Sequence, residues 1–160
     1  MRWIWIDKFI EFTPRTSATA VKNVTLAEEH LHDLYPAFPI VPHSLIVEGM
    51  AQTAGILVGE ARNFAEKVIL AKIGKASFHR LVRPGDTIVF SARIDQLSEA
   101  GASISGTVKV GDDLVAEIDL MFSHIDQNLA GVQFPEHNFV FTEQFTELLK
   151  TYQLSTAINI

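Results

Sequence analysis

The longest apolar segment of the chain begins directly after a proline-rich stretch. From about His43 to Asn63, apolar residues cover nearly the whole circumference of a predicted helix, which is typical of a helix buried on most of its sides. The prolines between Pro36 and Pro42 keep the residues before them extended, so the helix can begin only after them. Small residues recur on one edge of the helix, at Ala51, Gly55 and Gly59, and indicate that other backbone packs close to that edge.

Segments with strand character lie on both sides of the predicted helix. Two precede it, Trp3–Ile6 and Ala18–Thr25, and the stretch from Leu26 to Pro42 has the composition of a loop. The segments that follow the helix are Val68–Arg80, Asp86–Leu97, Ala102–Val110 and Asp113–Ile125. Three of these alternate with period two, and their connections are short enough for antiparallel hairpins. One buried helix among long antiparallel strands predicts an α+β fold.

The end of the chain has a different pattern of apolar and polar residues. After a connector that begins at Asp126, apolar residues repeat at helical spacing at Phe145, Leu148, Leu149 and Tyr152, which predicts an amphipathic helix. We therefore expect a domain over residues 1–125 and a C-terminal extension over 126–160 whose helix packs on the same domain or dimer. Contact with a distinct partner is the alternative.

Composition narrows the classes of function. The chain of 160 residues is long enough for one domain with a substantial core. Its formal charge of −6 argues against bulk affinity for nucleic acid or anionic membranes, and it contains no cysteine to form disulfides or ligate zinc. The apolar stretch Ser44–Gly59 is too short for a membrane span. The first residues lack a cleavage site and are expected to belong to the mature protein. We expect a cytoplasmic protein without a membrane span.

A glutamate interrupts the buried helix. Glu48 lies one turn into it, and Gln52, four residues later, shares its face. A carboxylate among apolar neighbours is costly unless it is paired or neutral. It is therefore either a structural group bonded to an amide or a carboxyl group used as an acid or base, with Gln52 orienting it.

The start of the same helix offers unpaired backbone amides near His43, Ser44 and Leu45, which can polarise a carbonyl oxygen. Four histidines, His30, His32, His43 and His79, are candidate partners of Glu48 or solvated loop residues. No pair has the spacing of metal ligands, so we expect no metal.

Three motifs follow one another along the chain. The run P-x-x-P-x-x-P-x-x-L-I-V-E-x-x-A-Q extends from Pro36 to Gln52, the strand AVKNVT precedes it, and FHRLVRPGD follows at Phe78–Asp86. Together they resemble the motifs of the 3-hydroxyacyl-acyl-carrier-protein dehydratases of fatty acid synthesis. The likeness runs from about Asp7 to Ile125. It implies a hotdog fold, in which an antiparallel sheet wraps a long central helix.

The resemblance also implies a homodimer with two shared active sites and no cofactor. Each site combines a histidine of one chain with the helix carboxylate of the other, and acyl carrier protein or acyl-CoA supplies the thioester. On this basis Glu48 and Gln52 match catalytic positions. Residues expected to contact substrate are Leu34, Tyr35, Pro42, Ser44, Met50 and Ile56.

The chain departs from the family motif H-F-P-G-x-P-x-x-P-G at its histidine and at both of its glycines. Leu34 occupies the position of the catalytic histidine, and Ala37 and His43 replace the two glycines. The loss of a general base typically lowers a rate by about 10² to 10⁴. His43, at the helix start, is the first candidate for a substitute base, and His32 is the second.

Three functions follow from these residues. The first is a dehydratase-like lyase acting on 3-hydroxyacyl thioesters in fatty acid or related lipid synthesis. The second is a hotdog thioesterase in which Glu48 activates water. The third is a non-catalytic acyl-binding subunit, paired with an active relative, because a fold can outlast its chemistry.

Basic residues are concentrated in the middle of the chain despite its negative charge. They form either a docking patch for an acidic acyl carrier protein or an ordinary solvated surface. The residues assigned to partner binding are Arg62, Lys72, Lys75, Arg80 and Arg83.

Overall fold

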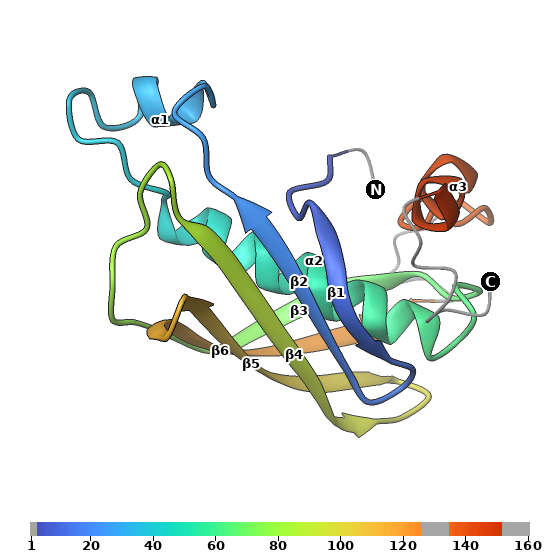
Figure 1. Cartoon of the computed structure of the whole chain (residues 1–160). Helices are drawn as coiled ribbons and strands as arrows, with labels where there is room; N and C mark the ends of the chain where they lie inside the picture. Colours follow the sequence, from blue (N-terminus) through green and yellow to red (C-terminus); the bar gives the residue numbers. More distant parts are fainter. Residues whose placement is uncertain (1–2, 126–134, 152–160) are drawn as a thin grey trace.

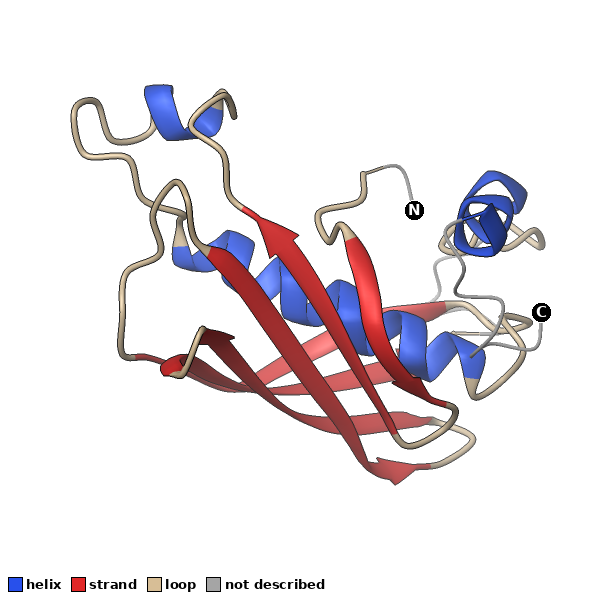
Figure 2. Ribbon diagram, in the orientation of Figure 1, coloured by secondary structure: helices blue, strands red, loops and turns tan. Residues whose placement is uncertain are grey.

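A long helix, α2 (His43–Glu60), lies in the hollow of a curved antiparallel sheet. The computed structural model describes residues 3–125 and 135–151. The strands are β1 (Lys8–Thr13), β2 (Ser17–Asn23), β3 (Val68–Phe78), β4 (Thr87–Leu97), β5 (Gly101–Val110) and β6 (Asp113–His124). Figures 1 and 2 show how the sheet wraps the helix, as the α+β hotdog prediction requires.

The strands pair in the order β1-β2-β4-β5-β6-β3. Every neighbouring pair is antiparallel, and β4, β5 and β6 form the meander that their period-two patterns predicted. Inward-facing residues such as Phe90, Ile104 and Ile118 are fully buried against α2. The core therefore lies between the helix and the concave face of the sheet.

Aromatic rings pack against the small residues of α2. A Cβ built on Gly59 would lie 2.5 Å from the Phe141 ring, and one on Gly49 would lie 2.3 Å from the Phe90 ring. A Cβ built on Gly55 would lie 3.4 Å from the ring of Phe122, which is ordinary van der Waals contact. The expectation that other backbone approaches this edge was wrong, because phenyl rings occupy the space that the missing side chains leave.

Two local predictions before α2 were also wrong. Trp3–Ile6 is not a strand, and the first strand starts at Lys8. The segment instead lies along α2, bonded to a side chain of that helix. Within the predicted loop, His30–Asp33 forms a single helical turn, α1, in which Leu31 is buried.

Strand β3 forms one edge of the sheet and is unusually open to solvent. All residues from Leu70 to Ala76 are exposed, including the apolar Leu70 and Ile73. A soluble monomer usually protects such an edge with charge, proline or a covering loop. Here apolar side chains accompany the free backbone groups of the edge.

The described part of the C-terminal segment packs near the end of α2 (Figure 1). Helix α3 (Glu143–Thr151) buries Phe145 and Leu149. The side chain of Asn138 donates hydrogen bonds to the carbonyl oxygens of Phe64 and Glu66, at 3.0 and 3.1 Å. The domain boundary at residue 126, Tyr152 and the side chain of Leu148 lie outside the described residues, and the assignment of this extension stays a prediction.

Candidate active site on helix α2

Glu48 is half-buried, and Gln52 holds its carboxylate in place. The amide nitrogen Nε2 of Gln52 donates a hydrogen bond of 2.7 Å to Oε1 of Glu48. The same nitrogen donates to the carbonyl oxygen of Trp3 at 3.0 Å, and Oε1 of Gln52 accepts the backbone N–H of Trp5 at 2.7 Å. Because Gln52 is only 3% exposed, these bonds satisfy its amide in place of water. The three hydrogen bonds therefore fix the orientation of the Gln52 amide group relative to Glu48.

The first turn of α2 begins without a side-chain cap. The carbonyl oxygen of Pro42 accepts the amides of Leu45 and Ile46, at 2.9 and 3.3 Å. Within the described part of the chain, the amides of His43 and Ser44 have no acceptor. They lie at the positive end of the helix dipole, about one turn before Glu48, and can donate to a carbonyl oxygen of a ligand.

The ring of His43 stacks on the ring of Phe78 at the end of β3. Their centroids lie 3.9 Å apart and the planes differ by 4°. His43 precedes Glu48 by five residues, which is about 140° around a helix. The two side chains therefore leave α2 in different directions, and the structure does not bring them together within one chain.

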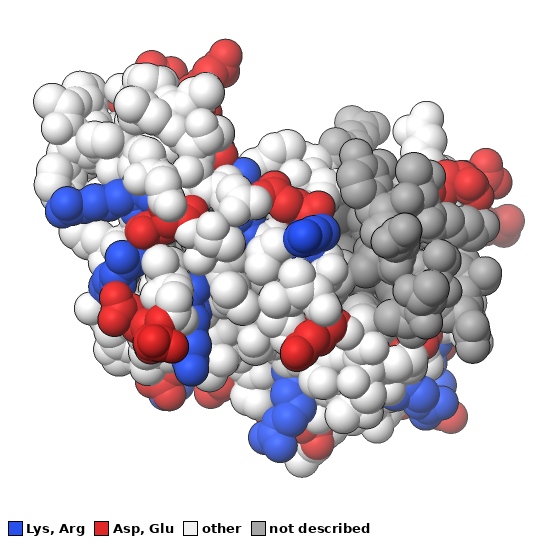
Figure 3. Space-filling model, in the orientation of Figure 1, with Lys and Arg blue, Asp and Glu red and all other residues white. Residues whose placement is uncertain are grey.

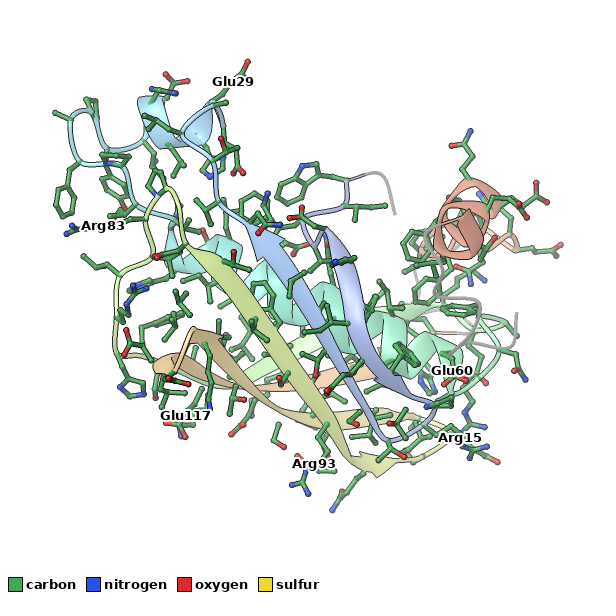
Figure 4. The ribbon with its side chains drawn as sticks, viewed as in Figure 1. Arg15, Glu29, Glu60, Arg83, Arg93 and Glu117 are labelled. Atoms are coloured by element: carbon green, nitrogen blue, oxygen red, sulfur yellow. The ribbon has the colours of Figure 1, made fainter. Side chains whose placement is uncertain are left out.

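The loop before α2 presents apolar side chains to solvent. Leu34 is 51% exposed, and Tyr35 and Phe38 are exposed beside it. The guanidinium of Arg83 lies over the Phe38 ring, 5.3 Å from its centroid. Figure 4 shows Arg83 on this side of the molecule.

Ala37 has a backbone conformation that favours glycine. Its φ is +64°, in the left-handed region that favours glycine. The turn is closed by a hydrogen bond of 3.0 Å from the Phe38 amide to the Tyr35 carbonyl oxygen. The loop thus follows a glycine-type path without the glycine.

Two of the predicted substrate-binding residues lie inside the core of their own chain. Met50 and Ile56 are essentially inaccessible, and the sulfur of Met50 packs where Gly106 lacks a side chain. Pro42 is half-buried and Ser44 is exposed. The role of these residues in acyl binding stays a prediction.

The basic residues assigned to partner binding do not form one cluster. Arg62 follows the end of α2, whereas Arg80 and Arg83 lie near its start, where the amide of Val41 bonds to the carbonyl oxygen of Val82. The two ends of this helix are about 27 Å apart. In Figure 3, Lys and Arg are spread among acidic side chains on the visible face.

Arg80 is held mainly by two acidic side chains of its own chain. Its guanidinium donates hydrogen bonds of 3.0 and 3.3 Å to Asp86 and lies 3.3 Å from Asp113. Burial alone would raise the pKa of Asp86, but the hydrogen bonds and charge of Arg80, helped by Arg83, hold that pKa below its usual range. The bond with Asp86 in turn raises the pKa of Arg80. This pair fixes the connection between β3 and β4.

The other cations differ in how firmly they are held. Arg62 lies 3.9 Å from Glu66, and Lys75 lies 3.5 Å from Glu117. The pKa of Glu117 is lowered, first by its hydrogen bond from His79 and then by the charge of Lys75. Among the described residues, no carboxylate lies within ion-pair distance of Lys72 or Arg83.

The structure contains a polar cluster beside Gln52 that the sequence did not predict. The indole of Trp5 packs edge-on against the His30 ring, with centroids 5.4 Å apart, and Nζ of Lys22 lies 4.7 Å from the Trp5 centroid. Lys22 donates 2.9 Å to Glu28, whose other carboxylate oxygen lies 3.5 Å from Nε2 of His30. These residues come from separate segments, so no local pattern signalled the cluster.

Neither a metal centre nor a membrane helix is present among residues 3–125 and 135–151. No three His, Asp or Glu side chains there are grouped to hold a metal ion. None of the described helices has both the length and the apolar character needed to cross a bilayer.

Comparison with known proteins places these motifs in a family. The family model of the FabA-like domain matches residues 4–119. This chain belongs to the FabA-like family. Two curated FabA-like relatives are named 3-hydroxyacyl-[acyl-carrier-protein] dehydratase FabZ. The protein from Thermoanaerobacter is 37% identical over 121 residues, covering 75% of this chain and 85% of its own. That from Rickettsia bellii is 40% identical over 119 residues, covering 72% and 81%.

Solved structures support the FabA-like fold of the chain. The dehydratase heterocomplex ApeI:P from Xenorhabdus doucetiae contains a chain that matches this one with a TM-score of 0.65 at 14% sequence identity. The alignment covers 76% of this chain and 83% of that one. The resemblance to the dehydratase family and the hotdog fold are therefore confirmed, and the protein is a dehydratase-like hotdog protein.

Proposed function

We propose that the protein acts on 3-hydroxyacyl thioesters as a dehydratase-like hydro-lyase, with Glu48 as its acid. The observation that carries the proposal is the 2.7 Å hydrogen bond from Gln52 that orients the Glu48 carboxyl group. Two unpaired amides lie about one turn earlier on α2, at His43 and Ser44. A thioester carbonyl held by such amides is polarised, which acidifies its C2 proton.

The chemistry removes water from the substrate. A base takes the proton from C2, the electron pair forms the C2–C3 double bond, and the C3–O bond breaks. Protonated Glu48 gives its proton to the departing hydroxyl, so water and an enoyl thioester leave. The position of the family's histidine holds Leu34, so the base must be another group.

The substrate carrier is expected to be acyl carrier protein or acyl-CoA. The curated relatives are named for acyl-carrier-protein substrates. The guanidinium of Arg83 lies over Phe38 and forms no ion pair with a carboxylate among the described residues, so it is the cation best placed to meet an acidic carrier. Arg80 is already engaged by Asp86 and Asp113.

A homodimer is expected to form through β3. The edge carries exposed Leu70 and Ile73 together with exposed residues as far as Ala76. A second copy of β3, added antiparallel, would satisfy the free backbone groups and cover the apolar side chains. Such pairing would also bring together the α2 helices that the active sites require.

Leu34 favours a second candidate, a non-catalytic acyl-binding subunit. Its exposed aliphatic side chain cannot accept a proton. In this case the chain would pair with an active relative that supplies a histidine. The fold and the Glu48–Gln52 pair would then serve binding.

The test is formation of enoyl thioester from 3-hydroxyacyl carrier protein by the purified homodimer, with acyl-carrier binding measured in parallel. Turnover that disappears in Glu48→Gln supports the hydro-lyase. Binding without turnover by the unmodified chain, and turnover in Leu34→His, supports the non-catalytic subunit. Release of free thiol would instead indicate a thioesterase. The absence of both acyl-carrier binding and turnover would refute the proposal.

A further inference from the structure

The turn of α1 places one histidine a single helical turn before Leu34. The amide of Leu34 donates a hydrogen bond of 3.3 Å to the carbonyl oxygen of His30, and Leu34 itself has helical dihedral angles. Residues four apart in a helical turn share a face. An imidazole at position 30 therefore lies on the same side of this turn as the family's catalytic position.

A carboxylate faces the ring of His30. Oε2 of Glu28 lies 3.5 Å from Nε2 of His30, at ion-pair distance but outside hydrogen-bond geometry. Glu28 is fixed by the 2.9 Å bond from Lys22, and Asp7 also lies 3.7 Å from the Lys22 ammonium. A carboxylate beside one ring nitrogen favours the neutral tautomer with its proton on that nitrogen, so the lone pair of the other nitrogen can accept a substrate proton.

The ring of His30 is also connected to the acid. It packs on Trp5, whose backbone N–H donates to Gln52, and Gln52 donates to Glu48. His30 is half-buried, which is compatible with both solvent contact and a defined orientation. The same contacts set the positions of the imidazole and of the Glu48 carboxyl group of one chain, and in a shared site each of these groups would meet its counterpart from the other chain.

The other histidines are placed less well for this role. The ring of His43 is stacked on Phe78 and projects about 140° away from Glu48. Nε2 of His32 is engaged by the carbonyl oxygen of Leu26 at 2.5 Å. His79 pairs with Glu117 on the exposed end of the sheet.

We propose that His30, oriented by Glu28, is the catalytic base that replaces the imidazole missing at Leu34. The inference rests on the proposed hydro-lyase function. Nδ1 of His30 takes the C2 proton of the 3-hydroxyacyl thioester as the C3–O bond breaks, and Glu48 protonates the leaving hydroxyl. Transfer of one proton from His30 to Glu48 through solvent restores both groups, so the protons balance.

Two substitutions at His30 separate chemistry from folding. His30→Gln removes the imidazole, whereas His30→Phe keeps an aromatic ring against Trp5 and lacks a base. Both are expected to lower kcat for enoyl formation by about 10² or more while binding of the acyl carrier changes less than threefold. Thermal unfolding verifies that the variants remain folded.

A matched control is available elsewhere in the chain. His79 lies 3.4 Å from Glu117, nearly the separation between His30 and Glu28, so His79→Gln removes a similar pair and should leave kcat unchanged. Glu28→Gln should lower kcat by about tenfold and alter its pH profile, because the charge facing the imidazole is lost. Leu34→His added to His30→Gln should restore turnover.

Several results would overturn this assignment. Retained turnover in folded His30→Phe and His30→Gln would exclude His30 as the base, and a selective loss in His43→Gln would assign that role to His43. Acyl-carrier binding without any turnover by the unmodified protein would exclude His30 as a base but leave acyl binding intact. Absence of both binding and turnover would refute the proposed function itself.

Discussion

Gln52 Nε2 lies 2.7 Å from Glu48 Oε1, while the other atom of the same amide, Oε1, lies 2.7 Å from the backbone nitrogen of Trp5. One side chain thus joins the candidate acid to a segment 47 residues away. Because Trp5 also packs on His30, the N-terminal segment links the candidate acid and the proposed base of the same chain. The position of Glu48 consequently depends on a segment that no motif marked.

Replacing Gln52 by Leu is expected to destabilise the protein by about 2 kcal/mol, because the Trp5 amide and the Trp3 carbonyl group lose their buried partner. Urea unfolding measures the difference. Gln96→Leu, at an exposed position of β4, is the matched control and should change stability by less than about 0.5 kcal/mol. Equal stability of the two variants would show that the amide is dispensable.

Gly59→Ala is expected to destabilise the protein by about 1 to 3 kcal/mol, because the new methyl group would lie 2.5 Å from the ring of Phe141. Gly55→Ala is the control on the same helix, since its nearest neighbour is 3.4 Å away. This control should be neutral or stabilising by up to about 1 kcal/mol through helix propensity.

The Gly59 result can be checked by a double-mutant cycle. Phe141→Leu should recover part of the loss caused by Gly59→Ala, because a smaller side chain leaves room for the methyl group. Additive effects of the two substitutions would contradict the proposed contact between helix α2 and the C-terminal segment.

Ala37→Gly is expected to stabilise the protein by up to about 1 kcal/mol. The left-handed φ of +64° costs alanine more than glycine, although glycine adds entropy to the unfolded chain. The midpoint of urea unfolding is the measurement. Ala71→Gly, in the exposed strand β3, should instead be destabilising, and a loss of stability in Ala37→Gly would show that the turn tolerates alanine without strain.

The Arg80–Asp86 pair predicts an acid-dependent loss of stability. Since the folded-state pKa of Asp86 lies below its usual range, its contribution is present above the unfolded-state pKa and is lost as the pH falls through the folded-state pKa. Solvent exposure of Arg80 limits the effect to about 1 kcal/mol.

Urea midpoints between about pH 2 and 7 measure this contribution. Asp86→Asn should lower stability at neutral pH and flatten the profile on the acidic side. Asp95→Asn, which removes the exposed partner of Arg93 at 3.1 Å, is the control. Parallel acid profiles for the unmodified protein and Asp86→Asn would contradict the role assigned to the pair.

The sequence by itself determined the elements with long, regular patterns. The apolar run after Pro42 predicted α2, and the period-two runs predicted β4, β5 and β6, because burial on one face repeats with the geometry of each element. The i, i+4 spacing of Glu48 and Gln52 predicted their hydrogen bond for the same reason. Local spacing is sufficient whenever both partners lie on one regular element.

Only the tertiary structure decided contacts between distant segments. Trp3–Ile6 resembled a strand, yet a buried amide on α2 satisfies its backbone. The glycines of α2 receive rings from β4, β6 and the C-terminal segment. His30 resembled a solvated loop residue, but packing on Trp5 and the charge of Glu28 give it an orientation. Such contacts depend on which surfaces folding brings together, and the periodicity of apolar residues along the chain does not predict them.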